Sequence, residues 1–85
     1  MYQIEIAPAA ERSLRKLSAD IQRRLIKGIL KLELEPRPSG VKKLSGAEEL
    51  YRIRIGDYRV VYEIRDGELI VLIVRVAHRR EVYRR

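Results

Sequence analysis

The feature that most limits the possible folds of this chain is an alternation of apolar and polar residues on both sides of a two-residue turn. Residues 51–55 alternate in this way, residues 58–62 do so except at Val61, and Gly56-Asp57 lies between the two segments. This pattern is typical of a β-hairpin. One face of such a hairpin is apolar, so the fold has to cover that face with other elements.

The hairpin places arginines on its other face. With Gly56-Asp57 as the loop, Arg54 is expected directly opposite Arg59, and Arg52 opposite Val61. Like charges at opposed positions destabilise a sheet by up to about 1 kcal/mol. We therefore infer that the two arginines bind a shared anion, of which phosphate is the obvious candidate.

The other elements follow from the same kind of pattern. Residues 2–6 alternate like a half-buried strand, and two stretches with apolar residues at helical spacing come next, the first after Pro8 and the second after Ser18 and before Pro36. A second two-residue turn is predicted at Asp66-Gly67. The expected elements are a strand over 2–6, helices over 9–17 and 19–34, a loop over 35–46, the hairpin strands, and a strand over 69–76 that is apolar on both faces.

These elements predict an α+β fold. An N-terminal strand and a two-helix hairpin precede a three-stranded antiparallel meander, and the helices pack on one face of the sheet. The expected core face consists of Tyr51, Ile53, Ile55, Tyr58, Val60, Tyr62, Ile64, Leu69, Val71 and Ile73. The opposite face is expected to carry Arg52, Arg54, Arg59, Val61, Glu63, Ile70, Leu72 and Val74.

Composition limits the class of protein. A length of 85 residues predicts one domain over 1–85, and 46% hydrophobic with 36% charged residues is ordinary for a soluble globular chain. There is no apolar run of membrane-spanning length and no signal-peptide pattern, so we expect a cytoplasmic protein that does not enter membranes. With no Cys and a single His, thiolate and multi-histidine metal sites are excluded.

The charge favours a polyanionic partner, which in the cytosol usually means nucleic acid. The formal net charge is +7. Every lysine occurs at or before Lys43. From Arg52 to Arg85 the chain contains arginines but no lysine. Because the planar guanidinium matches phosphate and stacks on bases, the C-terminal half is interpreted as the recognition half.

Four motifs resemble the bacterial and archaeal RelE/ParE toxins, and the matching order of the expected elements extends the resemblance over nearly the whole chain. The motifs are Lys43-Leu44-Ser45-Gly46, Tyr51-Arg52-Ile53-Arg54, Gly56-Asp57-Tyr58-Arg59-Val60-Val61-Tyr62 and His78-Arg79-Arg80-Glu81-Val82-Tyr83. The resemblance implies a toxin of a type II toxin-antitoxin system. In the RelE branch such toxins are ribosome-dependent endoribonucleases that cut mRNA in the A site, whereas the ParE branch poisons DNA gyrase, so the fold alone does not choose between them.

The charge pattern favours the RelE branch. The resemblance implies that Arg52 positions the RNA backbone, that Arg54 and Arg59 hold the scissile phosphate, that Arg79 stabilises the leaving oxygen and that Tyr83 is the base. The reaction is then attack of a 2′-hydroxyl on the adjacent phosphorus, with no cofactor and no metal. A tyrosine has an ordinary pKa of about 10, so nearby cations would have to lower it.

His78 is a second candidate for proton transfer, because histidine titrates near neutral pH. The alternative is a structural histidine that ends a strand and bonds to backbone. Simple alternation places His78, and not Arg79, on the face of Arg54 and Arg59. Arg79 reaches that site only if the chain bulges or leaves the sheet near Ala77.

Further residues have expected roles in binding. Lys42, Lys43 and Arg80 are expected to attract RNA. The resemblance implies a cognate RelB-like antitoxin that covers Ile70, Leu72 and Val74 in a hetero-oligomeric complex, with the ribosome and mRNA as targets. The rival hypotheses are a gyrase poison and a noncatalytic basic RNA-binding module.

Overall fold

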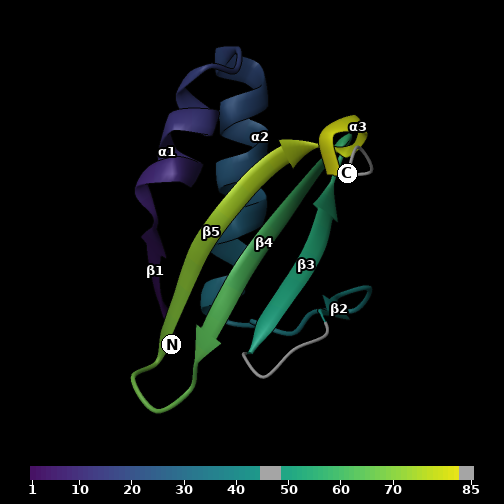
Figure 1. The fold of residues 1–85 in the computed structure, drawn as a ribbon. Helices are drawn as coiled ribbons and strands as arrows, with labels where there is room; N and C mark the ends of the chain where they lie inside the picture. The colour runs from purple at the N-terminus through teal and green to yellow at the C-terminus, as the bar shows by residue number, and fades with distance from the viewer. Residues whose placement is uncertain (45–48, 83–85) are drawn as a thin grey trace.

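A five-stranded sheet organises the part of the chain that the computed structural model describes, residues 1–44 and 49–82. The strand order is β1-β5-β4-β3-β2, with β1 parallel to β5 and the other pairings antiparallel. The α1 and α2 helices lie together behind the sheet in Figure 1, which confirms the predicted α+β class. The elements are β1 (Gln3–Ile6), α1 (Pro8–Arg15), α2 (Ala19–Leu30), the 3₁₀ helix η1 (Lys31–Glu33), β2 (Lys42–Lys43), β3 (Leu50–Ile55), β4 (Tyr58–Arg65), β5 (Ile70–His78) and α3 (Arg79–Val82).

The two long helices begin as the sequence predicts. Pro8 occupies the first turn of α1, and the Ser18 hydroxyl oxygen accepts a hydrogen bond from the Ile21 N–H at 3.4 Å. The second helix is shorter than predicted, because its α-helical part ends at Leu30 and η1 follows. No helix among the described residues is long and apolar enough to cross a membrane.

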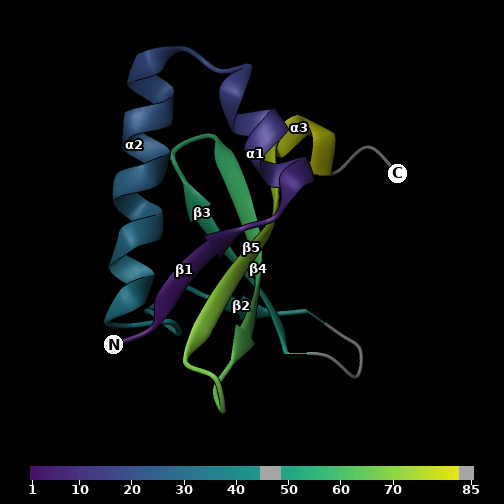
Figure 2. The ribbon, with the colours of Figure 1, turned by 90° about the vertical axis from the view of Figure 1, so that its left-hand side faces the viewer.

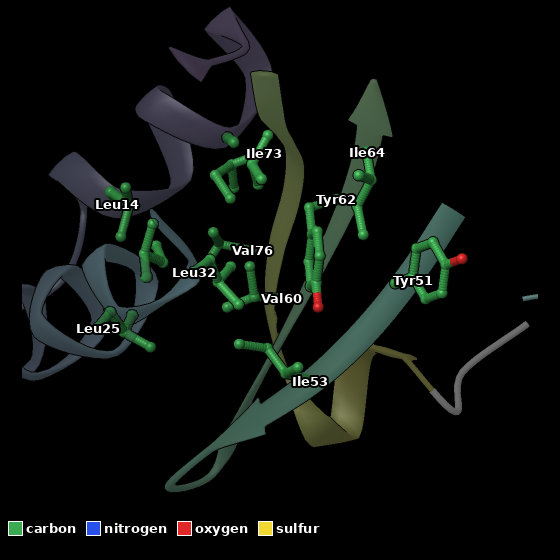
Figure 3. Packing of buried hydrophobic residues seen from close by; sticks show 13 residues of the cluster. Leu14, Leu25, Leu32, Tyr51, Ile53, Val60, Tyr62, Ile64, Ile73 and Val76 are labelled. Atoms are coloured by element: carbon green, nitrogen blue, oxygen red, sulfur yellow. The ribbon is translucent and has the colours of Figure 1, made fainter. Parts of the chain in front are cut away.

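The core lies between the helices and the predicted face of the sheet. Figure 3 shows Val60, Tyr62 and Ile53 on the strands beside Leu25 and Leu32 of the helical layer. Fully burying a side chain of this size contributes about 1.5–3 kcal/mol, so this face fixes which side of each strand points inward. The opposite side of β3, β4 and β5 is called the open face below, and α2 and α3 lie on opposite sides of the sheet in Figure 2.

The connection between β4 and β5 differs from the prediction. Four residues join the strands, since Arg65 pairs with Ile70, and the residue with positive φ is Leu69 at 56°. The predicted two-residue turn at Asp66-Gly67 is therefore wrong, as is the core position of Leu69, which is 49% exposed. The pairing moves by two residues, so the strand keeps its predicted faces beyond the turn.

A β-bulge interrupts β5. Val61 pairs with Arg75 and Tyr62 pairs with Ile73, so Val74 is an extra residue on β5. The role of Arg79 required the chain to bulge or to leave the sheet near Ala77, and this bulge lies three residues before that position. Beyond the bulge, the β5 residues that simple alternation assigns to one face of the sheet lie on the other face. This reversal determines the face on which the residues at the end of β5 lie.

The sequence analysis missed the fifth strand. Residues 42–43 were assigned to a loop, but they form β2, which pairs Lys42 with Arg52 and Lys43 with Tyr51. Two adjacent lysines carry no alternating pattern, so only the partner strand reveals them as a strand. The pairing attaches the long connection after η1 to the edge of β3.

Candidate functional site

The hairpin of β3 and β4 holds three arginines in the predicted register. Arg54 pairs with Arg59 and Arg52 pairs with Val61, both as predicted. Gly56 has φ +60° at the first central position of the turn, which a type II′ hairpin turn requires. The local sequence therefore sets two guanidinium groups on opposed positions of the open face.

A pocket of about 220 Å³ lies on this arrangement. Lys42 reaches it because β2 pairs Lys42 with Arg52. Four cations around one small pocket suit a phosphate, since charge-assisted hydrogen bonds to its oxygens are the strong ones. The pocket, called the basic pocket below, is lined by Gly40, Lys42, Arg52, Ile53, Arg54 and Arg59.

Arg59 is the buried member of the basic pocket. The residue is only 8% exposed, although it lies on the face that α2 does not cover. Its pairing partner on β5, Ala77, is 5% exposed, and α3 contacts both β4 and β5 beside them. A largely desolvated cation interacts more strongly with an anion than an exposed one does. Arg59 is thus the fixed donor of the pocket.

Arg54 is the exposed member of the opposed pair. Its Nε donates a hydrogen bond to the Gly56 carbonyl oxygen at 3.1 Å. This contact with the hairpin turn orients the planar guanidinium before an anion binds. The side chain therefore loses less conformational entropy on binding. One arginine of the pair is therefore held by burial and the other by the turn.

Lys43 does not join the basic pocket. Its backbone position pairs with the core-facing Tyr51, and its Nζ lies 2.8 Å from a Glu49 carboxylate oxygen. The hydrogen bond from Lys43 lowers the pKa of Glu49 and raises the pKa of Lys43. The two lysines of β2 thus point to opposite faces, and only Lys42 adds charge to the pocket.

The end of β5 does not place His78 where simple alternation predicts. The bulge reverses the faces, so His78 pairs with Tyr58, and the two rings meet edge to face with centroids 5.3 Å apart. The Nδ1 atom of His78 accepts a hydrogen bond from the Arg80 N–H at 3.2 Å. The placement of His78 on the face of Arg54 and Arg59 is wrong, and this contact is the kind expected of a structural histidine.

Arg79 leaves the sheet, as its predicted role requires. It begins α3, it is exposed, and its N–H donates to the Asp57 carbonyl oxygen at 2.8 Å. Arg80 is exposed in the same turn, while Tyr83 lies outside the described residues. The hydrogen bond to Asp57 ties the start of α3 to the hairpin turn beside Arg54.

Arg37 ties the connection between η1 and β2 to Tyr51 of β3 and to the connection between β4 and β5, and the sequence analysis did not single it out. Its Nη2 lies 2.9 Å from an Asp66 carboxylate oxygen, its Nε donates to the Tyr51 hydroxyl at 3.1 Å, and its guanidinium lies 5.1 Å from the centre of the Tyr51 ring. The Tyr2 hydroxyl donates to Asp66 at 2.6 Å. The hydrogen bonds from Arg37 and then Tyr2 lower the pKa of Asp66. Arg37 stands between Pro36 and Pro38, and this spacing was its only signal in the sequence.

The aliphatic residues predicted to bind a partner lie toward the other end of the open face. Ile70, Leu72 and Val74 are all half-buried. Leu72 pairs with Glu5 on β1 and with Glu63 on β4, so carboxylates flank it on both sides. The open face therefore has a basic end and an apolar end with an acidic border.

Comparison with known proteins places the chain beside a set of toxins. Residues 4–83 match the family model described as the ParE toxin of the type II toxin-antitoxin system parDE. Toxin RelE of Mycobacterium tuberculosis is 34% identical, covering 98% of this chain and 87% of that protein. The mRNA interferase toxin RelE of Escherichia coli K12 is 29% identical, covering 96% and 90%. The structure of an archaeal RelE-RelB complex from Pyrococcus horikoshii OT3 matches with a TM-score of 0.82 at 32% identity, covering 92% of this chain and 94% of that one.

Proposed function

The chain belongs to the family of RelE and ParE toxins of type II toxin-antitoxin systems, and on this premise we propose that it is a ribosome-dependent endoribonuclease that cleaves mRNA. The observation that carries the proposal is the basic pocket, in which Lys42 and three arginines surround a space suited to one phosphate. A relative whose name is mRNA interferase supports the same activity.

The proposed reaction is attack of a ribose 2′-hydroxyl on the adjacent phosphorus. The 2′-oxygen forms the new bond, the bond to the 5′-oxygen breaks, and the products are a 2′,3′-cyclic phosphate and a 5′-hydroxyl. Arg54 and Arg59 bind the phosphate oxygens and stabilise the charge that develops on them. Arg52 and Lys42 hold the neighbouring backbone. The fixed position of Arg59 supports this role because a preorganised donor needs no reorientation during the reaction.

Proton transfer belongs to the C-terminal segment in this proposal. Tyr83, as the phenolate, takes the proton of the 2′-hydroxyl. Arg79, at the start of α3, stabilises the leaving 5′-oxygen, which takes a proton from water to become the 5′-hydroxyl. His78 serves as a positioning residue, since its Nδ1 accepts from the Arg80 N–H. It is thereby kept beside Tyr58 and away from the basic pocket.

We also propose a cognate antitoxin as the partner that neutralises the protein. Solved relatives include RelE-RelB complexes, and the apolar end of the open face offers a surface for such a partner. Ile70, Leu72 and Val74 would then be covered in a hetero-oligomeric complex. Arg80 and Lys43 contribute to long-range attraction of RNA.

Primer extension on a defined mRNA in a translating extract tests the enzymatic proposal. We compare the protein with Arg54→Gln and with Arg12→Gln, which removes the same charge from an exposed position of α1. We expect cuts within the A-site codon that require ribosomes. The yield of these cuts should fall about a hundredfold in Arg54→Gln and should persist in Arg12→Gln. Intact mRNA in an active extract would overturn the proposal, and DNA cleavage with purified gyrase would then identify a gyrase poison.

A further inference from the structure

A second pocket of about 620 Å³ adjoins the basic pocket. Its walls are mainly apolar and include Leu32, Ile53 and Ile55, while Lys31, Glu35 and Ser39 supply polar groups. Binding sites for small molecules are commonly clefts of about 300–1,000 Å³ with apolar walls and a few polar groups. This one, called the edge pocket below, therefore has the size and lining of a ligand site.

The edge pocket exists because β2 is short. In the described part of the chain β2 pairs only with Tyr51 and Arg52, so the edge of β3 beyond them has no strand beside it. The α2 helix approaches that edge closely at Gly28, where a Cβ atom would lie 2.6 Å from Ile55 Cδ1. The cleft between α2, η1 and the edge of β3 thus results from the sheet topology.

The two pockets share part of their lining. Gly40, Ile53 and Arg54 line both of them. Gly40 has φ +88°, and a Cβ atom built there meets nothing within 4 Å, so this residue places no side chain between the two spaces. A phosphate held by the cations would have its own nucleoside within reach of the edge pocket.

We propose that the edge pocket binds a base of the RNA strand whose phosphate lies in the basic pocket, and that Glu35 selects bases with an exocyclic amino group over uracil. This inference rests on the proposed function, since it names the part of the substrate that the same site reads. Single-stranded RNA is recognised through unstacked bases whose edges form hydrogen bonds and whose faces stack on apolar groups or arginine. An ionised carboxylate only accepts hydrogen bonds, so it favours an amino group and disfavours the carbonyl oxygens of uracil.

An NMR titration of the amide groups tests occupancy of the edge pocket directly. The probes are inorganic phosphate and the 3′- and 5′-monophosphates of guanosine and uridine. We expect phosphate to shift the amides near Arg54 and Lys42 only, and guanosine monophosphate to shift those of Gly28 and Ser39 as well. Nucleotides that shift only the first group would overturn the base pocket while the anion site stands. If no probe shifts either group, both the pocket and the anion site are overturned.

A matched pair of variants tests whether Glu35 selects the base. Glu35→Gln is compared with Glu33→Gln, which removes the same charge from η1 outside the pocket lining. Because glutamine also donates to uracil, we expect the preference for guanosine over uridine monophosphate to fall about tenfold in Glu35→Gln only. Phosphate affinity should remain equal in both variants, which shows that the fold and the basic pocket are intact. An equal preference in the two variants would overturn the selection by Glu35.

Discussion

Arg54 lies directly opposite Arg59 across the hairpin of β3 and β4, and both residues line the same pocket. Two like charges at opposed positions lower the stability of the fold and favour binding of an anion between them. Replacing Arg54 with Gln is expected to leave the free energy of unfolding unchanged or to raise it by up to about 1 kcal/mol, because a like-charge pair disappears. Urea denaturation measures this effect. A fall of about 2 kcal/mol, typical of a damaging core change, would show that Arg54 is structural.

The two lysines of β2 provide a comparison within one strand. Lys42 lines the basic pocket, whereas Lys43 pairs with Glu49 on the other face. Lys42→Gln should weaken binding of single-stranded RNA and reduce the slope of log K against log salt by about 0.7, the value for one phosphate contact. Lys43→Gln should change the slope much less. Filter binding over a salt series measures both, and equal slopes in the two variants would contradict the placement of Lys42.

Tyr62 links the core to the loop that carries Gly40. Its buried hydroxyl donates to the Pro36 carbonyl oxygen at 2.7 Å, and burial raises the pKa of the phenol well above its usual range. Tyr62→Phe leaves that carbonyl without its donor, so the free energy of unfolding should fall by about 1–3 kcal/mol. Urea denaturation measures the change, with Tyr58→Phe on a half-buried tyrosine as the control. A loss of equal size in both variants would argue against a specific role of the contact.

Asp66 gives the protein a stabilising charge that acid removes. Its pKa is lowered by the hydrogen bonds from Arg37 and Tyr2, so its folded value lies below the unfolded value of about 3.9. Its contribution is complete above that unfolded value and is lost as the pH falls through the lower folded value. We expect Asp66→Asn to be less stable than the parent at pH 7, and the difference to shrink below about pH 4. Thermal unfolding between pH 2 and pH 7 measures it, and a constant difference would contradict the ion-pair role.

The sequence predicted the part of the structure that local patterns determine. The alternation around Gly56 determines both the hairpin register and the face of each arginine, and the structure confirms both. The bulge at Val74 was missed because most of β5 is apolar on both faces; its one signal was Arg75, which an unbroken alternation puts on the core face. The same ambiguity misplaced His78.

The candidate site could be predicted only in part for a related reason. The arginines of the hairpin are near one another in sequence, so their shared pocket follows from the register. Lys42 joins them through its pairing with Arg52 on β3, which no local pattern reveals. The edge pocket likewise depends on where β2 stops.

A substitution at Leu72 is expected to weaken antitoxin binding without changing RNA binding. It is half-buried at the apolar end of the open face, between Glu5 and Glu63 in register, and it does not line the basic pocket. Leu72→Glu adds a third carboxylate there, so affinity for the cognate antitoxin should fall at least about tenfold, as for an interface residue that contributes more than 1 kcal/mol. Calorimetric titration with the antitoxin measures the affinity. Leu34→Glu, at a leucine that is 78% exposed, is the matched control and should bind as the parent does. RNA affinity should stay unchanged in both variants, and an equal antitoxin affinity in both would place the antitoxin on another surface.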